Sequence, residues 1–214
     1  MNTIQANGYP IHFNEKGYSE LNKFLSENKY SNIFIFADSG TNEQCLPVFL
    51  PNLETDLAIE IIEFEAGEEN KNIETCIELW KVLTELKGDR KSLVINVGGG
   101  VVTDLGGFVA STFKRGIDFI HVPTTLLAMV DASVGGKNGV DLGSLKNQVG
   151  VINVPKMVLV DTQFLETLPQ NQMRSGLAEM LKHGLIYDKK YWNLFSDLNN
   201  LNTNDLDTLI YQSV

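Results

Sequence analysis

The sequence LVINVGGGVVTDLGGFV, residues 93–109, carries the strongest fold signal in this chain. Its first five residues predict a buried strand, three glycines follow, and the apolar run at residues 101–109 predicts a helix. Glycines at such a turn let the backbone approach a phosphate closely, and the helix N-terminus offers free N–H groups. The turn therefore suits a dinucleotide pyrophosphate. A tight strand–helix turn explains the glycines equally well, because the full G-x-G-x-x-G spacing is absent.

Further strand-like runs alternate with helix-like runs on both sides of this turn. Residues 72–86 predict a helix that ends near Gly88, with Ile73, Cys76, Ile77, Trp80 and Leu83 on one apolar face. Continuous apolar strands separated by helices indicate a Rossmann-like α/β fold with a mainly parallel sheet. The other predicted strands are residues 33–36, 57–64, 119–122 and 157–160.

The pattern changes near Leu168-Pro169 and is mainly helical from there on. We therefore expect an α/β domain at residues 1–168 and the beginning of an all-α domain at residues 169–214. Residues 199–207 are polar and predict a loop. One side of the first helix after the boundary carries Met173, Leu177, Met180 and Leu181.

Composition excludes several classes of protein. The chain has 214 residues, 43% of them hydrophobic, which suits a globular fold with a core. A formal net charge of -10 argues against nucleic acid or an anionic membrane as the main partner. The two cysteines, Cys45 and Cys76, suggest neither a disulfide scaffold nor a zinc knuckle. No signal peptide or bilayer-spanning run is visible, so we expect a cytoplasmic enzyme.

Charged residues follow two of the predicted strands. Asp38 comes just after the strand at residues 33–36, and Glu68 and Lys71 lie between a strand and the helix at residue 72. An α/β sheet binds ligands outside the carboxyl ends of its strands, where a carboxylate can accept hydrogen bonds from a ribose. Taken singly, each is better explained as a solvated loop charge.

The stretch DASVGGK, residues 131–137, is harder to explain as scaffold. Gly135-Gly136 permits a sharp turn that presents Lys137, and Lys146-Asn147 supplies another cation and an amide shortly afterwards. With Arg115, these cations could neutralise a phosphate or carboxylate. The alternative is that they are solubility charges, which the neighbouring glycines make less suitable for Lys137 than for Arg115.

Glu179, Lys182 and His183 share one face of a predicted helix. Glu179 is a candidate metal ligand and Lys182 a neighbouring cation. A structural salt pair is the usual explanation for Glu followed by Lys on a helix. Apolar neighbours suggest a partly buried face, where a charge needs a partner or a metal.

Taken together, these motifs resemble the 3-dehydroquinate synthases. The resemblance covers essentially the whole chain and implies an α/β NAD-binding domain followed by a helical metal-binding domain, with the active site between them. It implies NAD⁺, a divalent metal (zinc or cobalt), a homodimer, and no nucleic-acid or membrane partner. The motifs, in order, are the glycine turn through Asp104, PTTLL at 123–127, DASVGGK at 131–137, KN at 146–147 and GLAEMLK at 176–182.

The implied activity is the conversion of 3-deoxy-D-arabino-heptulosonate 7-phosphate to 3-dehydroquinate and phosphate, a lyase step of the shikimate pathway of aromatic amino acid biosynthesis. By position, Glu179 would be the first metal ligand. The substrate contacts would be Asp131, Lys137, Lys146, Asn147, Lys182 and, in a neighbouring subunit's site, Arg115. The cofactor contacts would be Asp38, Glu68, Lys71, Gly99, Gly100, Asp104, Thr124, Thr125, Leu127, Phe164, Thr167 and Leu168.

The chain departs from the family pattern at the metal site. That pattern takes two further histidines from the later helical domain, and none of His12, His121 and His183 stands in their positions. We therefore expect the N-terminal part of such an enzyme, which binds NAD weakly and turns over poorly or not at all. The alternatives are another sugar-phosphate cyclase, a metal-dependent polyol dehydrogenase relative, or a non-catalytic nucleotide-binding module.

Overall fold

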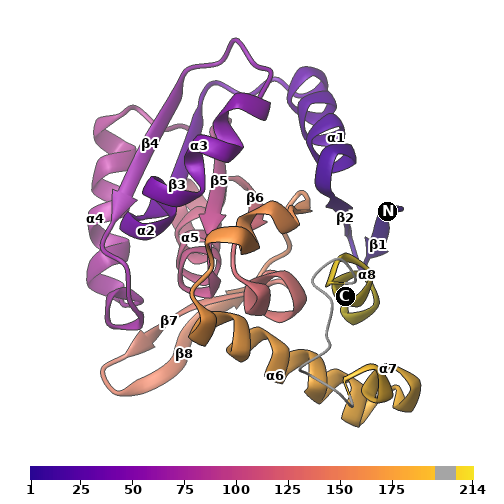
Figure 1. Cartoon of the computed structure of the whole chain (residues 1–214). Coiled ribbons are helices and arrows are strands. Elements are labelled where there is room, and N and C mark those ends of the chain that lie inside the picture. Colours follow the sequence, from indigo (N-terminus) through magenta and orange to yellow (C-terminus); the bar gives the residue numbers. More distant parts are fainter. Residues whose placement is uncertain (196–205) are drawn as a thin grey trace.

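The computed structural model describes residues 1–195 and 206–214. Its centre is a seven-stranded sheet of order β1-β2-β9-β6-β5-β3-β4, parallel except for β1 (Figure 1). This confirms the predicted Rossmann-like fold class. The strands of the sheet are β1 (Ile4–Ala6), β2 (Tyr9–Phe13), β3 (Ile33–Asp38), β4 (Ile59–Phe64), β5 (Leu93–Gly98), β6 (Asp118–Pro123) and β9 (Val158–Val160).

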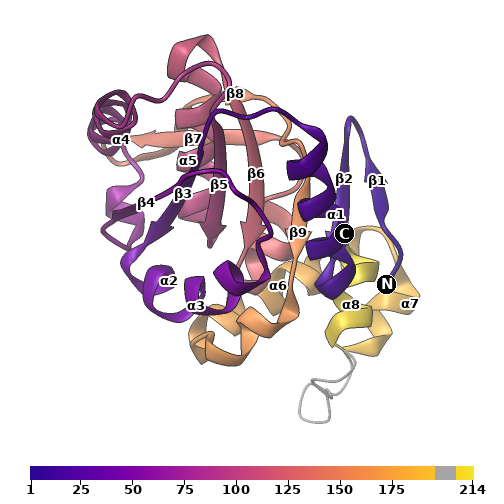
Figure 2. The same cartoon turned by 90° about the horizontal axis from the view of Figure 1, so that it is seen from above.

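Helices cover both faces of the sheet (Figure 2). In the described ranges, none combines the length and apolar character needed to cross a membrane. The longer helices are α1 (Asn14–Glu27), α4 (Ile73–Glu85), α5 (Gly100–Thr112), α6 (Gln170–Ile186) and α8 (Leu206–Ser213). The shorter ones are α2 (Ser39–Gln44), α3 (Leu46–Phe49), η1 (Leu50–Asn52), η2 (Glu68–Asn70), η3 (Phe113–Arg115), the π-helical turn η4 (Ala128–Ala132), η5 (Thr162–Thr167) and α7 (Lys189–Leu194).

The side chains of each central strand pack into two separate hydrophobic clusters, one on each face of the sheet. In β3, Ile33 and Ile35 enter the cluster that includes α1, α3 and α6, whereas Phe34 and Phe36 enter the cluster beneath α4 and α5. Successive side chains of a strand point to opposite faces, so a strand covered on both sides must be apolar throughout. This is why these strands form continuous apolar runs in the sequence.

Two hairpins were absent from the sequence-based description. The N-terminal one pairs β1 with β2, and the other pairs β7 (Lys137–Leu142) with β8 (Leu145–Ile152). Polar residues and glycines dilute the alternation in β7 and β8. The available signal was Gly143-Ser144 between the two strands, because Gly-Ser is a two-residue hairpin connection and Gly143 has φ +59°.

The predicted helix over residues 72–86 is confirmed to within one residue, but one of its predicted buried positions and the end of the predicted loop were wrong. Helix α4 ends at Glu85, and Lys87 rather than Gly88 takes the left-handed conformation, with φ +60°. Ile77 is exposed, and Leu79 is buried in its place, because the buried stripe lies slightly further round the helix. Of the loop predicted at residues 199–207, residues 199–205 lie outside the described part, whereas Leu206 and Asp207 begin α8. Both cysteines are free and buried.

The helical segment after Pro169 packs against the sheet domain. Met180 of α6 is fully buried in the same cluster as Ile33, and Leu209 and Ile210 of α8 join it. The predicted apolar side of α6 is confirmed, since Met173, Leu177 and Leu181 pack against that cluster. The division into two domains remains a prediction.

Gly176 sets how closely α6 approaches η4. A Cβ at this position would lie 2.4 Å from Leu126 Cγ and 2.7 Å from the backbone nitrogen of Leu127. We expect Gly176→Ala to lower the free energy of unfolding by about 1–2 kcal/mol, because α6 must move outward. Urea denaturation measures this, with the exposed neighbour Ser175→Ala as control. Equal stability of the two variants would show that the contact is not limiting.

Candidate active site

The predicted cofactor residues gather where the strands of the parallel sheet end. Asp38 ends β3, Glu68 and Lys71 follow β4, the glycines follow β5, and Thr124-Thr125 follows β6. Strands β4, β3, β5 and β6 are adjacent and parallel. Their carboxyl ends therefore form one edge, which is the position where open α/β sheets bind ligands.

The glycine turn is a close-packed corner. A Cβ on Gly98 would lie 2.4 Å from Val102 Cγ2, and one on Gly99 would lie 2.9 Å from Thr125 Cγ2. Neither glycine has a positive φ, so close approach rather than unusual backbone conformation requires them. Gly99 is the N-cap of α5 and supplies no side-chain cap. The first N–H groups of a helix have no intrahelical partner, so this corner fits an anion such as a pyrophosphate.

Lys71 is the centre of an ion-pair network at this edge. Its side chain is only 5% exposed, and Nζ lies 3.3 Å from Asp104 Oδ2, 3.5 Å from Glu68 Oε1 and 3.8 Å from Asp141 Oδ1. Nζ also donates to Asn147 Oδ1 at 2.9 Å. The solvated-charge explanation therefore fails for Lys71. Asp141, which the sequence analysis missed, belongs to the same network.

The hairpin residues contact the cofactor-side residues directly. Lys146 Nζ donates to Glu68 Oε1 at 2.8 Å, and Asn147 lies against Lys71. Asn147 adopts φ +54°, and its backbone N–H donates to Asp141 Oδ1 at 2.7 Å. Residues predicted for the cofactor and residues predicted for the substrate are thus hydrogen-bonded to each other in this structure.

A pocket of about 420 Å³ lies between α5, η4 and the β7–β8 hairpin. It brings together residues that the sequence analysis assigned separately to cofactor and substrate. Gly135 and Gly136, with φ +100° and +71°, form the sharp turn expected before Lys137. The residues that line the pocket include Asp104, Asp131, Ala132, Lys137, Asn138, Asn147 and Gln148.

Burial raises the pKa of Asp104 to about 6 from an ordinary 3.8, and Lys71 limits the rise. The folded state thus holds this proton more tightly than the unfolded chain, so stability falls as pH rises from about 4 to about 6. The asparagine of Asp104→Asn stays neutral. We therefore expect the free energy of unfolding of the variant, relative to that of the unsubstituted chain, to rise by about 2–3 kcal/mol between pH 4 and pH 7.

Denaturant unfolding of both proteins across that pH range measures the difference. Groups other than Asp104 titrate in both chains and cancel. A difference that stays constant with pH would mean that Asp104 titrates normally.

A second cluster adjoins the pocket through Asp131. One ligand atom each from Asp131, Glu179 and His183 lies within 4.8 Å of the others. Glu179 also forms an ion pair with Lys182, and its Oε1 lies 3.3 Å from His183 Nε2. Burial lowers the pKa of His183, Lys182 lowers it further, and Asp131 opposes the shift. Two carboxylates and an imidazole are donors that suit Zn²⁺ or Co²⁺.

The structure confirms that Glu179 and His183 share a helix face. It also brings Asp131 to them, although the sequence analysis gave Asp131 only a substrate role.

The remaining predicted residues lie around the same edge or away from it. Asp38 Oδ1 accepts from the N–H of Thr41 and caps α2. Thr124 is buried, and the side chain of Thr125 caps the turn that contains the partly buried Leu127. In and after η5, Phe164 is buried in the core, Thr167 is exposed and Leu168 is half-buried.

Arg115 stands apart from all of these residues. It is exposed in η3, which leads into the amino end of β6 and so lies at the edge of the sheet opposite the glycine turn. Lys114, Arg115 and Gly116 all have positive φ, at 52°, 74° and 108°. Within one chain the structure does not bring Arg115 to the pocket.

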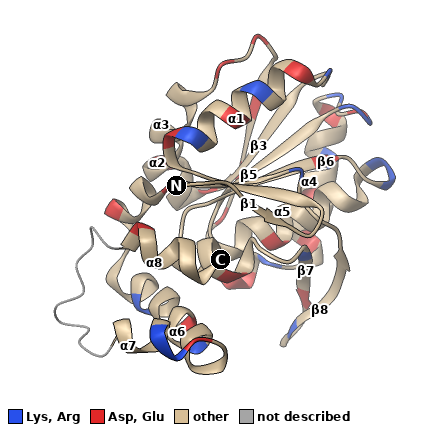
Figure 3. Ribbon diagram, turned by 90° about the vertical axis from the view of Figure 1, so that its right-hand side faces the viewer, with Lys and Arg blue, Asp and Glu red and all other residues tan. Residues whose placement is uncertain are grey.

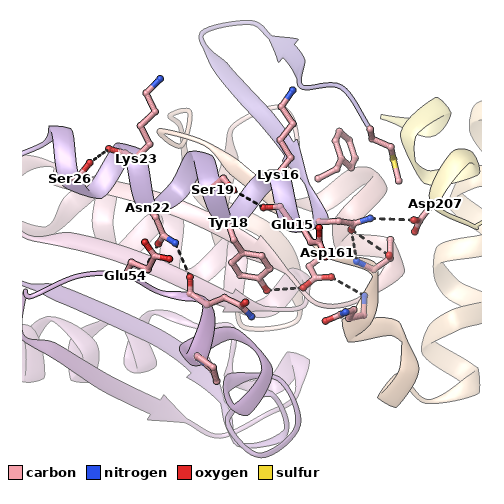
Figure 4. A pocket seen from close by; sticks show the side chains of 17 residues that line it. Glu15, Lys16, Tyr18, Ser19, Asn22, Lys23, Ser26, Glu54, Asp161 and Asp207 are labelled. Carbon is pink, nitrogen blue, oxygen red and sulfur yellow. Dashed lines mark hydrogen bonds between the residues drawn. The ribbon is translucent and has the colours of Figure 1, made fainter.

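A larger hollow, of about 1240 Å³, runs along α1 (Figure 4). No residue predicted for cofactor, substrate or metal lines it. Tyr18 Oη donates to Asp161 Oδ2 at 2.7 Å, and Asn14 Nδ2 donates to Asp207 Oδ2 at 3.2 Å. These contacts join α1 to η5 and α8. Acidic and basic residues are interspersed along α1 (Figure 3). The smaller pocket, where the predicted residues meet, is therefore the candidate active site.

Comparison with known proteins identifies the family of this chain. The family model described as 3-dehydroquinate synthase N-terminal matches residues 61–175. A 3-dehydroquinate synthase from Parabacteroides distasonis is 42% identical over 198 residues, which cover 92% of this chain and 56% of the relative. One from Acetivibrio thermocellus is 40% identical over 196 residues, covering 88% and 53%. The chain spans about half the length of these curated relatives.

A solved structure gives the same result for the fold. The structure of 2-deoxy-scyllo-inosose synthase, complexed with carbaglucose-6-phosphate, NAD⁺ and Co²⁺, matches with a TM-score of 0.86 and 27% identity. The match covers 99% of this chain and 60% of that one.

Proposed function

Because the chain belongs to the 3-dehydroquinate synthase N-terminal family, we propose that it forms the NAD-binding part of such a synthase and part of its substrate pocket. The reaction is the conversion of 3-deoxy-D-arabino-heptulosonate 7-phosphate to 3-dehydroquinate and phosphate. The observation that carries the proposal is the 420 Å³ pocket, where Asp104, Asp131, Lys137 and Asn147 line one wall.

Different residues at the sheet edge would bind different parts of NAD⁺. The N-terminus of α5 with Gly99 and Gly100 faces the pyrophosphate, while Asp38 and Glu68 accept from ribose hydroxyls. If bound at this edge, NAD⁺ would supply hydride withdrawal and return at a ring alcohol, and a divalent metal would supply polarisation of the oxygen of that alcohol. Asp131, Glu179 and His183 supply metal-type donors beside the pocket.

The pocket also suits an anionic substrate. Lys137 lines it, and Lys146 and Lys182 are exposed cations from the hairpin and from α6. To bind a substrate anion, Lys146 must leave its ion pair with Glu68. A ribose hydroxyl bound to Glu68 would favour that change of partner. Ammonium groups on flexible stems hold phosphate or carboxylate as point charges.

Arg115 and the oligomer form a separate part of the proposal. Arg115 is exposed at the far edge of the sheet, on backbone with positive φ at two non-glycine residues. Strained backbone of this kind is concentrated at functional positions. We propose that Arg115 reaches the substrate phosphate of a neighbouring copy in a homodimer. A cytoplasmic location is also part of the proposal, supported by the small-molecule cofactor and substrate.

Calorimetric titration tests the proposed function. NAD⁺ is titrated into the chain first, and 3-deoxy-D-arabino-heptulosonate 7-phosphate is then titrated into the NAD⁺-saturated chain. We expect both to bind, and sedoheptulose 7-phosphate, which lacks the carboxylate, to bind more weakly. Preference for sedoheptulose 7-phosphate would favour another cyclase. Lack of NAD⁺ binding would contradict the proposal.

A further inference from the structure

We propose that Tyr9 is a positioning residue, which aims Lys137 into the candidate pocket by holding the backbone of the Gly135-Gly136 turn. None of the residues assigned above to cofactor, substrate or metal comes from the N-terminal hairpin of β1 and β2, where Tyr9 lies. The inference gives that hairpin a part in the site. It rests on the proposed function for the ligand that Lys137 binds.

The side chain of Lys137 depends on its own backbone for its direction. Lys137 lines the pocket, but no described residue forms a hydrogen bond or an ion pair with its ammonium group. Lys71, Lys146 and Lys182, by contrast, each pair with a carboxylate. The two residues before Lys137 are glycines, which have the widest choice of backbone conformation. The turn therefore needs contacts from outside to keep Lys137 in one place.

Tyr9 supplies such a contact from the main sheet. Its side chain belongs to the core cluster and is only 3% exposed. Its Oη accepts a hydrogen bond from the backbone N–H of Gly135 at 2.8 Å, and this bond joins residues 126 positions apart. A tyrosine ring that is packed in a core holds its hydroxyl at a fixed point. The first glycine of the turn is thereby tied to β2.

The second glycine of the turn is held by the hairpin that follows it. The carbonyl oxygen of Gly136 accepts from the N–H of Asn153 at 2.9 Å and from Asn138 Nδ2 at 3.0 Å. A Cβ on Gly136 would lie 2.9 Å from Val154 Cγ1, so the turn is also closely packed. These contacts hold the β7–β8 hairpin to itself. The bond to Tyr9 fixes the turn relative to the sheet, and so relative to the pocket.

Tyr9→Phe tests the inference, because it removes the hydroxyl and leaves the ring in the core. Circular dichroism checks that the variant folds. We expect faster amide hydrogen exchange at Gly135, whose N–H loses its acceptor. We also expect the ¹⁵N order parameter of Lys137 to fall from a rigid value of about 0.85 toward about 0.6. An unchanged order parameter would overturn the inference.

Tyr30→Phe is the matched control for Tyr9→Phe. It also removes a tyrosine hydroxyl with a hydrogen bond, since Tyr30 Oη donates to Asp118 Oδ2 at 2.9 Å. Asp118 begins β6, at the edge of the sheet opposite the glycine turn. We expect this variant to leave both the exchange at Gly135 and the order parameter of Lys137 unchanged. A fall in that order parameter in both variants would show that Tyr9 acts only through general stability, and would overturn the inference.

Substrate affinity shows whether Tyr9 acts through Lys137. 3-Deoxy-D-arabino-heptulosonate 7-phosphate is titrated into the NAD⁺-saturated chain. We expect Tyr9→Phe to weaken its binding about 3- to 10-fold, the range for one lost hydrogen bond, and Lys137→Met to weaken it at least about 10-fold. Adding Tyr9→Phe to Lys137→Met should change the affinity less than about 2-fold, because the positioned cation is already gone. Equal losses from Tyr9→Phe in both backgrounds would overturn the inference.

The outcomes also separate this inference from the proposed function. If the heptulosonate phosphate does not bind the unsubstituted chain, the proposed function is contradicted, and the order parameter of Lys137 still decides whether Tyr9 holds the turn. If the heptulosonate phosphate binds with the same affinity to the unsubstituted chain and to Tyr9→Phe, the synthase proposal stands and the role of Tyr9 is overturned.

Discussion

Replacing Lys71 with methionine is expected to lower the free energy of unfolding by about 3–5 kcal/mol. The lysine is nearly inaccessible and faces three carboxylates, those of Asp104, Glu68 and Asp141. Removing it leaves the largely buried Asp104 without its closest positive partner. Breaking a buried ion pair from one side costs far more than the pair contributes. Urea denaturation at pH 7 measures the loss.

The double variant Lys71→Met, Asp104→Asn shows whether the unpaired carboxylate is the cause. If it is, the second substitution restores more than half of the lost stability, because both charges are gone. Lys81→Met removes a cation from an exposed i,i+3 pair with Glu78 and serves as control, with an expected change under about 0.5 kcal/mol. Equal effects of Lys71→Met and Lys81→Met would contradict the network described here.

Gly107→Ala is expected to destabilise the chain by about 3–4 kcal/mol. A Cβ at this position of α5 would lie 1.8 Å from Asn138 Oδ1 and 3.2 Å from His121 Cε1. Asn138 is buried, and its Nδ2 donates to the carbonyl oxygens of Gly136 and Asn153, which closes the base of the β7–β8 hairpin. The methyl group must therefore displace this buried amide, at the cost of its hydrogen bonds.

Gly100→Ala is the matched control for Gly107→Ala. It lies in the same helix, and its added Cβ would meet only Ala132 Cβ at 3.4 Å. We expect its free energy of unfolding to change by no more than about 1 kcal/mol, because alanine has a better helix propensity than glycine. The second measurement is hydrogen exchange of the hairpin, which should accelerate in Gly107→Ala. Unchanged protection in β7 and β8 would show that Asn138 does not anchor them.

Local patterns were enough to predict the core of the fold. The strands at residues 33–36 and 93–97 are apolar on both sides because helices cover both faces of the sheet. Such continuous apolar runs can be recognised in a single sequence. The glycine turn after residues 93–97 and the place of Asp38 just after the strand at residues 33–36 were likewise predicted from the sequence. The β7–β8 hairpin was missed because Lys137, Asn138 and Lys146 interrupt the alternation on which strand prediction depends.

The contacts that build the site could not be predicted in the same way. Lys71 meets Asp104 across 33 residues and Asn147 across 76, and no local signal encodes such pairs. Whether a charge is solvated or buried depends on these tertiary partners, so the local sequence favoured a solvated loop charge for Lys71. The hydrogen bond between Gly135 and Tyr9 likewise joins residues 126 positions apart.

The central claim is that the carboxyl edge of the sheet, from Glu68 to the glycine turn, binds NAD⁺. Amide chemical-shift mapping of the ¹⁵N-labelled chain during an NAD⁺ titration tests it most directly. We expect the largest amide shifts at Gly99, Gly100 and Val101 and around Lys71, with smaller ones along the hairpin at Asn147. Shifts confined to the hollow along α1, or no saturable shifts at all, would contradict it.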